Sequence, residues 1–360
     1  MKILNYILPL LLNKGEIFEY SRESINSLLK LKKDLDISFL KEQNIKSKLI
    51  TIPLTSLDFS TNTNILPVRN YVKQNNIKIY HCLNNGFSLF PCNNLKKICT
   101  INTILPLSDP DVVDKFYIEK YQNKVESALD LSNKIIVPFY YMKTELINTF
   151  HINEEKISVI YPIVSELFKN VNSTSSKIYI RSKFKINFDY LIYIGEINPR
   201  NTLIETLNIF YILYMNDMNL RLILSITYLN KNKNFYLSLL SYIEQLNIQD
   251  NVIILTNITE LDKIHLLNNA LCFLYLNQYN ELNLSILQCL SLNTKILCHP
   301  SEGNLESLEN YPIYYTESMD LEDILLDDIS FDDSDQEFIL GKYNYIDNTE
   351  EIYEIYTSLL

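Results

Sequence analysis

Short runs of apolar and β-branched residues alternate with longer amphipathic stretches along almost the whole chain. Each parallel strand has to be reached by a crossover connection, usually a helix, so this alternation is typical of a largely parallel sheet covered by helices. In the first half, strands are expected at 1–4, 48–52, 78–81, 97–101, 134–137 and 156–161, and helices at 17–31, 112–131 and 143–150. The pattern predicts an α/β fold.

The same alternation restarts in the second half. Strands are expected at 190–194, 220–226, 252–255, 271–276 and 295–298, and helices at 202–215, 233–246, 260–269, 284–292 and 350–360. The Asn- and Ser-rich run 170–176 is the best linker signal between the halves. A length of 360 residues suffices for two domains with full cores. We expect an N-terminal domain at 1–172, a C-terminal domain at 173–345 and a last helical segment at 346–360.

Charge and composition exclude several classes of function. The chain carries 32 basic and 43 acidic residues, a formal net charge of −11, which argues against nonspecific binding to nucleic acid or anionic lipid. No apolar run reaches the ~18–20 residues of a membrane span, so no transmembrane segment is expected. The six cysteines form no CxxC pair, which favours reduced thiols in a cytoplasmic protein over disulfides or a metal site. The acidic segment 317–337 is interpreted as a solvated, partly disordered face.

Glycine is unusually rare in this sequence. There are 5 glycines in 360 residues, far below the average of about 7%. Glycine allows positive φ and close approach of the backbone to a ligand. The sequence therefore offers few places for a phosphate-binding glycine loop.

Several segments carry motifs that resemble those of family 4 glycosyltransferases. They are Lys-Ile-Ser-Val-Ile-Tyr-Pro at 156–162 with Phe168, Tyr-Ile-Gly-Glu-Ile-Asn-Pro-Arg-Asn at 193–201, the stretches 251–270 and 279–294, and, nearer the N-terminus, Tyr-His-Cys with Asn-Gly at 80–86 and the segment 100–106. Their order and spacing match the family over nearly the whole chain. The resemblance implies the GT-B fold, in which two Rossmann-like domains face each other across a cleft and the last helix returns to the first domain.

The same resemblance implies a reaction and a set of site residues. The family transfers a sugar from a UDP or GDP donor to an acceptor hydroxyl, usually with retention of configuration, and needs no metal or further cofactor. Matching its donor motifs onto this sequence gives Arg200, Asn201, Asn280, Glu281 and Gln288. Only Arg200 keeps the family residue: Asn201 replaces a lysine, Asn280 and Gln288 replace two carboxylates, and Glu281 replaces a glycine. Negative charge builds on the leaving diphosphate, so the lost cation weakens the site.

The first domain shows similar departures from the family. Gly15 stands in the N-terminal loop that is rich in glycine elsewhere in the family, and Asn102 replaces the histidine of the segment at 100–103. Further cleft candidates are His81, for which a buried structural role is the favoured interpretation, and His299 and Glu302 after the last expected strand. His151 and His265 are expected at the surface. The catalytic residues themselves stay unknown.

Three hypotheses from different classes follow. The first is a degenerate glycosyltransferase subunit that supports an active glycosyltransferase or binds its acceptor glycan or protein. The second is an active retaining hexosyltransferase with a rearranged site. The third is a carbohydrate-binding module that uses the first domain alone.

Overall fold

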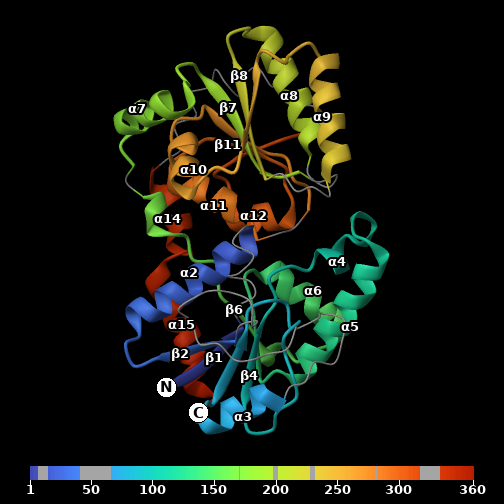
Figure 1. Ribbon diagram of the computed structural model, residues 1–360, viewed down its shortest axis with the longest axis vertical. Coiled ribbons are helices and arrows are strands. Elements are labelled where there is room, and N and C mark those ends of the chain that lie inside the picture. Colours follow the sequence, from blue (N-terminus) through green and yellow to red (C-terminus); the bar gives the residue numbers. More distant parts are fainter. Residues whose placement is uncertain are drawn as a thin grey trace. The chain divides into compact units, whose positions relative to one another are not determined.

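The structure is a computed structural model that describes residues 1–6, 15–40, 66–169, 171–197, 202–227, 232–279, 282–316 and 333–360 (Figure 1). The chain divides into two compact units. The first unit comprises Met1–Ile163, Asn280–Leu284 and Tyr343–Leu360, and the second comprises Val164–Tyr279 and Ser285–Lys342.

The first unit is built on a parallel sheet with the order β2-β1-β3-β4-β5-β6. Its strands are β1 (Lys2–Tyr6), β2 (Asp36–Leu40), β3 (Ile79–Cys82), β4 (Lys96–Thr100), β5 (Lys134–Val137) and β6 (Ile157–Val159). Its helices are α2 (Glu16–Leu31), α3 (Leu66–Gln74), α4 (Leu105–Ser108), α5 (Lys115–Leu131), α6 (Tyr140–Phe150) and α15 (Tyr345–Ser358), with short 3-10 turns η1 (Pro110–Val112) and η2 (Glu154–Lys156). In Figure 1, α2 and α15 lie on one side of these strands and α5 and α6 on the other.

The C-terminal helix α15 packs against α2 within the first unit. Lys32 forms an ion pair with Glu350, and the hydroxyl of Tyr353 donates to the carboxylate of Asp34 at 2.8 Å. Tyr356, a residue of α15, is fully buried in the apolar core that covers β1 and β3. The sheet face of the first unit is therefore closed by a segment from the far end of the sequence.

The second unit is built on another parallel sheet, with the order β12-β11-β10-β7-β8-β9. Its strands are β7 (Tyr190–Glu196), β8 (Arg221–Thr227), β9 (Val252–Thr256), β10 (Cys272–Tyr275), β11 (Ile296–Cys298) and β12 (Ile313–Tyr314). Its helical segments are η3 (Glu166–Phe168), α7 (Ser173–Phe184), α8 (Leu203–Asn216), α9 (Lys233–Gln245), α10 (Glu260–Leu267), α11 (Leu284–Ser291), α12 (Glu302–Leu308) and α14 (Asp333–Gly341). Parallel strands with near-continuous apolar runs fit a sheet covered on both faces.

The α/β class and the parallel sheets predicted from the alternation are confirmed, and most expected elements occur within a few residues of their positions. The interpretation of 170–176 as a linker is wrong in its second half, because α7 begins at Ser173. The side chain of Asn172 accepts a hydrogen bond from the Ser175 amide at 2.9 Å, so the Asn- and Ser-rich run is a helix cap. The expected strand at 48–52 lies outside the described residues. The end of the acidic segment forms α14.

Asparagine occupies many of the left-handed backbone positions that glycine usually takes. Positive φ angles near 50° occur at six asparagines of the described chain: Asn76, Asn85, Asn247, Asn257, Asn283 and Asn293. Asparagine tolerates this conformation better than most residues because its short polar side chain bonds locally. Left-handed backbone positions are therefore more frequent in this chain than the small number of glycines suggests.

Three observations on the described residues bear on function. Among them, no helix is long and apolar enough to cross a membrane. Within the same described residues there is no group of three or more His, Cys, Asp or Glu side chains placed to bind a metal ion. All six cysteines are free thiols, and only Cys92 is partly exposed.

Candidate functional site

In the sheet of the second unit, the order in which strands are added reverses beside β7. From β7 the chain continues to β8 and β9 on one side, and the later strands β10, β11 and β12 lie on the other side of β7. In open parallel sheets, ligands bind outside the carboxyl ends of the two strands that flank such a point. The residues that follow β7 in sequence include Arg200 and Asn201, and those that follow β10 include Asn280 and Glu281. These four residues lie outside the described residues.

A polar cluster lies beside this point. His299, which follows β11, places its Nε2 atom 3.0 Å from a carboxylate oxygen of Glu205 in the first turn of α8. The amide nitrogen of the exposed Gln278, three residues after β10, lies 3.4 Å from the same ring nitrogen. The imidazole also packs edge-on against Tyr315, with ring centroids 5.2 Å apart. Three groups from three segments thus meet at the carboxyl edge of the sheet.

The loop that follows His299 has a defined geometry. The side-chain amide of Asn304 donates to the backbone carbonyl of His299 at 2.8 Å, and the hydroxyl of Ser301 caps α12 by accepting from the backbone amide of Asn304 at 3.3 Å. Glu302 is the first residue of α12 and is exposed. His299 and Glu302 therefore lie three residues apart, before and at the start of α12, and among the described residues His299 contacts Glu205 across the sheet edge.

The helix α11 carries the remaining donor candidate of the second unit. Gln288 lies on this helix and is only 4% exposed. Asn283, directly before the helix, has φ of 56° and is fully buried. The resemblance implies that Asn283 replaces a glycine of the family's donor loop. A left-handed asparagine keeps the backbone conformation available there, so the substitution changes the side chain more than the path of the chain.

The first unit has an equivalent reversal point between β1 and β3. Asn5 of β1 pairs in register with His81 of β3. Among the described residues, both side-chain amide atoms of Asn5 are buried without a hydrogen-bond partner, and Asn5 lines a small pocket together with His81 and Tyr356. Gly15 precedes α2 with φ of 86° and is exposed. Gly15 is the N-cap residue of α2 and has no side chain that could cap the helix.

The structure places His81 in the core of the first unit. One ring nitrogen lies 2.7 Å from the hydroxyl of Tyr356, and the other lies 2.7 Å from the hydroxyl of Thr100. Burial lowers the pKa of His81 to about 3, so the imidazole is neutral near pH 7. This environment agrees with the interpretation of His81 as a buried structural histidine.

Asn102 holds a turn in place. The side-chain nitrogen of Asn102 donates to the carbonyl of Leu83 at 2.5 Å, and its backbone amide donates to the side chain of Asn85 at 2.6 Å. The residue is fully buried. The position where the family has a histidine is thus occupied by an amide that is used inside the protein.

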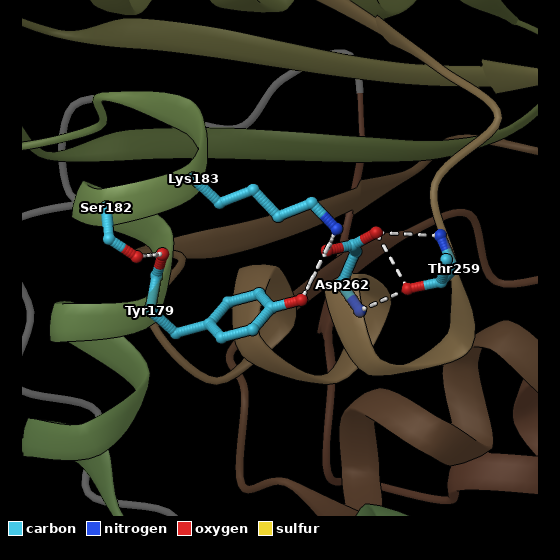
Figure 2. Close-up of polar contacts among 5 residues, drawn as sticks. All are labelled: Tyr179, Ser182, Lys183, Thr259 and Asp262. Carbon is cyan, nitrogen blue, oxygen red and sulfur yellow. Dashed lines mark hydrogen bonds and ion pairs between the residues drawn. The ribbon is translucent and has the colours of Figure 1, made fainter.

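A second polar cluster, shown in Figure 2, joins α7 to α10 in the second unit. One carboxylate oxygen of Asp262 accepts from Lys183 at 2.6 Å and from the hydroxyl of Tyr179 at 2.9 Å. The other oxygen accepts from the backbone amide of Thr259 at 2.9 Å and from its hydroxyl at 2.7 Å. Burial alone would raise the pKa of Asp262, but these hydrogen bonds outweigh it and lower the pKa to about 2. The Thr-x-x-Asp spacing at 259–262 is a capping-box signal that our sequence reading missed.

The expectation that His265 is a surface residue is wrong. His265 is half-buried, and its Nδ1 atom lies 2.7 Å from the hydroxyl of the fully buried Ser176. Its ring lies 4.2 Å from the ring of Tyr179, measured between centroids. Loss of solvent lowers the pKa of His265, while the nearby Asp262 acts in the opposite direction. The residue belongs to the α7–α10 contact. His151, exposed at the end of α6, is at the surface as expected.

Two parallel-sheet α/β units of this topology define the GT-B glycosyltransferase fold, which the comparison with solved structures supports directly. HepE from Anabaena, solved in complex with UDP and glucose, matches with a TM-score of 0.75 at 13% identity, over 99% of this chain and all of that one. Sucrose-phosphate synthase from Thermosynechococcus elongatus matches with a TM-score of 0.76 at 12% identity, over 100% and 99% of the two chains. A glycosyltransferase from Rickettsia africae matches with a TM-score of 0.73 at 14% identity, over 99% and 98%.

The sequence itself matches no known protein-family profile and no curated protein. Identities of 12–14% establish the fold alone. The GT-B class expected from the resemblance is therefore confirmed, while the activity has to be argued from the residues of this chain.

Proposed function

We propose that this chain is a glycosyltransferase-fold subunit with little or no transferase activity of its own, which supports an active glycosyltransferase or binds its acceptor. The observation that carries the proposal is the burial and hydrogen bonding of Asn102. This amide replaces the family histidine, is fully buried, and bonds to Leu83 and Asn85 in a turn. It can neither take up a proton at neutral pH nor face a substrate without breaking that turn.

The donor side supports the same conclusion through charge. Cleavage of a nucleotide sugar leaves a diphosphate, and prearranged cations and N–H donors stabilise the charge that develops on it. In the resemblance this chain keeps Arg200 but has Asn201 for the second cation, and amides at 280 and 288 for two carboxylates. Removing one such charge typically costs a catalytic site about 3–4 kcal/mol of transition-state stabilisation. Several changes of this kind together fit a repurposed site.

An active retaining transferase is the second candidate, and one observation favours it. His299, Glu205 and Gln278 form a polar cluster at the carboxyl edge of the second unit, beside the strand ends that precede the donor candidates. HepE has also been solved in complex with UDP-glucose, so this fold can hold a nucleotide-sugar donor. Under this alternative, the donor of the present chain is a UDP- or GDP-sugar, bound without a metal ion.

Thermal unfolding in the presence of UDP, GDP and their sugars separates the two candidates. A ligand that binds only the native state adds RT ln(1 + [L]/Kd), about 2.7 kcal/mol at a hundredfold excess over Kd. The subunit proposal predicts no shift with any of these nucleotides and no release of sugar from UDP-glucose. A shift specific for one nucleotide, abolished by Arg200→Ala, would instead establish the transferase alternative and name its donor class. Arg221→Ala, at the opposite end of the sheet, is the matched control.

The free cysteines make a cytoplasmic location part of the same proposal, because thiols persist in reducing compartments. Fractionation of cells that express the tagged chain tests it. Recovery in an extracytoplasmic fraction would contradict it.

A further inference from the structure

Two cysteines of the first unit lie side by side on neighbouring strands. Cys82 ends β3 and pairs in register with Cys99 of β4. Neighbouring strands are about 4.8 Å apart, which falls within the range of about 4.4–6.8 Å that Cα atoms span across a disulfide. Side chains of register partners on neighbouring parallel strands point to the same face of the sheet, so the two thiols are neighbours there. No large movement of the backbone is needed to bring the sulfur atoms together.

The surroundings make the two thiols chemically different. The Cys82 thiol donates to the Asn84 side-chain oxygen at 2.9 Å and lies 3.2 Å from the Ser88 hydroxyl. Burial alone would raise the pKa of Cys82, but hydrogen bonds from Cys99, Ser88 and the backbone of the turn outweigh it and bring the pKa to about 7. Burial raises the pKa of Cys99 well above its usual value. Cys82 is thus the nucleophilic thiol, and Cys99 is the thiol that can resolve an oxidised Cys82.

The turn that follows β3 lies next to the pair. Residues 84–88 connect β3 to the following segment, and Asn84, Phe87 and Ser88 are partly exposed there. Gly86 lies directly over Cys99, since a Cβ atom at Gly86 would be 3.4 Å from its sulfur. Both thiols are themselves buried, so a small oxidant reaches them when this turn opens.

We propose that Cys82 and Cys99 are a reversible redox site that closes to a disulfide on reaction with a hydroperoxide. The Cys82 thiolate attacks the O–O bond of hydrogen peroxide; an S–O bond forms, and the released hydroxide is protonated to water. The Cys99 thiol then loses its proton and attacks the sulfur of the Cys82 sulfenic acid. An S–S bond forms, the S–O bond breaks, and hydroxide leaves with that proton as a second water. Two thiols are oxidised by two electrons and one peroxide is reduced.

Closure of this disulfide changes the turn that holds Asn102. The Cys82 sulfur has to move towards Cys99 and away from Ser88 and Asn84, which are hydrogen-bonded to each other at 3.0 Å. Asn85 in the same turn accepts the backbone amide of Asn102. Oxidation of Cys82 therefore alters the turn at the carboxyl edge of the sheet in the first unit. This holds whether or not the chain is an active transferase.

Peptide mapping of the full chain tests the proposal. After treatment with hydrogen peroxide and blocking of free thiols, we expect a cross-link between the peptides of Cys82 and Cys99 with a loss of 2 Da, reversed by dithiothreitol. Trypsin alone leaves Cys82 and Cys92 on one peptide, so chymotrypsin has to separate them. Cys92→Ser is the matched control and should leave the cross-link unchanged. In Cys99→Ser, Cys82 should accumulate as a sulfenic acid that dimedone labels.

The mapping of the unmodified chain decides the outcome even if a variant fails to fold. A cross-link that involves Cys92 instead, or thiols at 82 and 99 that stay free while Cys92 is oxidised, would overturn the proposal. So would the absence of any oxidation of either thiol at a peroxide excess that converts all cysteines in the urea-unfolded chain.

Discussion

The carboxylate of Asp262 offers the most direct test of the structural reasoning, through the substitution Asp262→Asn. The side chain is 3% exposed and accepts hydrogen bonds from Lys183, Tyr179 and Thr259. Asparagine keeps the size of the side chain but has no charge and only one acceptor oxygen. The substitution should loosen the contact of α7 with α10 without leaving a cavity.

The magnitude follows from the pKa. A folded-state pKa of about 2, against an ordinary value of 3.8 for aspartate, corresponds to roughly 2 kcal/mol of stabilisation by the charged form. Because the folded pKa is depressed, this contribution is fully present above about pH 4–5 and is lost as the pH falls through about 2. At pH 6 the variant should therefore be less stable by about 2 kcal/mol, and the difference should shrink towards zero near pH 2.

Urea unfolding followed by circular dichroism measures this difference, since the chain has no tryptophan for fluorescence. Hydrogen exchange of α7 and α10 peptides restricts the readout to the second unit, because two units need not unfold in one step. Asp250→Asn, at an exposed aspartate of the same unit, is the matched control and should change stability by less than about 0.5 kcal/mol. A stability difference for Asp262→Asn that does not depend on pH would refute the reasoning.

Three further predictions concern the first unit. Gly86→Ala should lower its stability by more than about 1 kcal/mol in thermal unfolding, because the backbone has φ of 76° and the new Cβ would lie 2.1 Å from that of Ala128; an unchanged midpoint would contradict the geometry. Since the buried His81 is neutral with its pKa lowered to about 3, acid should destabilise this unit as pH falls from about 6.5 towards 3, and His81→Gln should flatten that dependence in pH-resolved unfolding. Asn283→Gly should be tolerated while Asn283→Ala costs about 1 kcal/mol, and equal stabilities of the two variants would argue against the left-handed backbone.

The fold was predictable because its signal is repeated many times. Strands such as β5 and β8 are continuous apolar runs, and their spacing from amphipathic helices identifies parallel sheets without any long-range information. The described strands that we missed are short or mixed in character: β2 combines Asp, Ser and apolar residues, and β12 has two residues. Such strands form because a neighbouring strand already offers its backbone groups, which no local pattern records.

The candidate site was harder to predict than the fold. Motif matching selected positions that follow β7 and β10 in sequence, as Arg200 after β7 illustrates, and their role stays a prediction. It gave no indication that Asn102 would be used to hold a turn, or that His299 would meet Glu205 from another helix. Those contacts join residues far apart in the sequence, so they depend on packing rather than on residue type. The position of asparagines at left-handed turns could have been anticipated from the shortage of glycine.

The first unit needs α15, which packs against α2 but is synthesised last. Chains emerge from the ribosome N-terminus first, and domains generally fold as they emerge. All of the second unit is synthesised between β6 and α15. The second unit can thus complete its sheet while the first unit still exposes the apolar face that Tyr356 and Ile352 later cover. During that interval the nascent first unit is the part of the chain that a chaperone would have reason to bind.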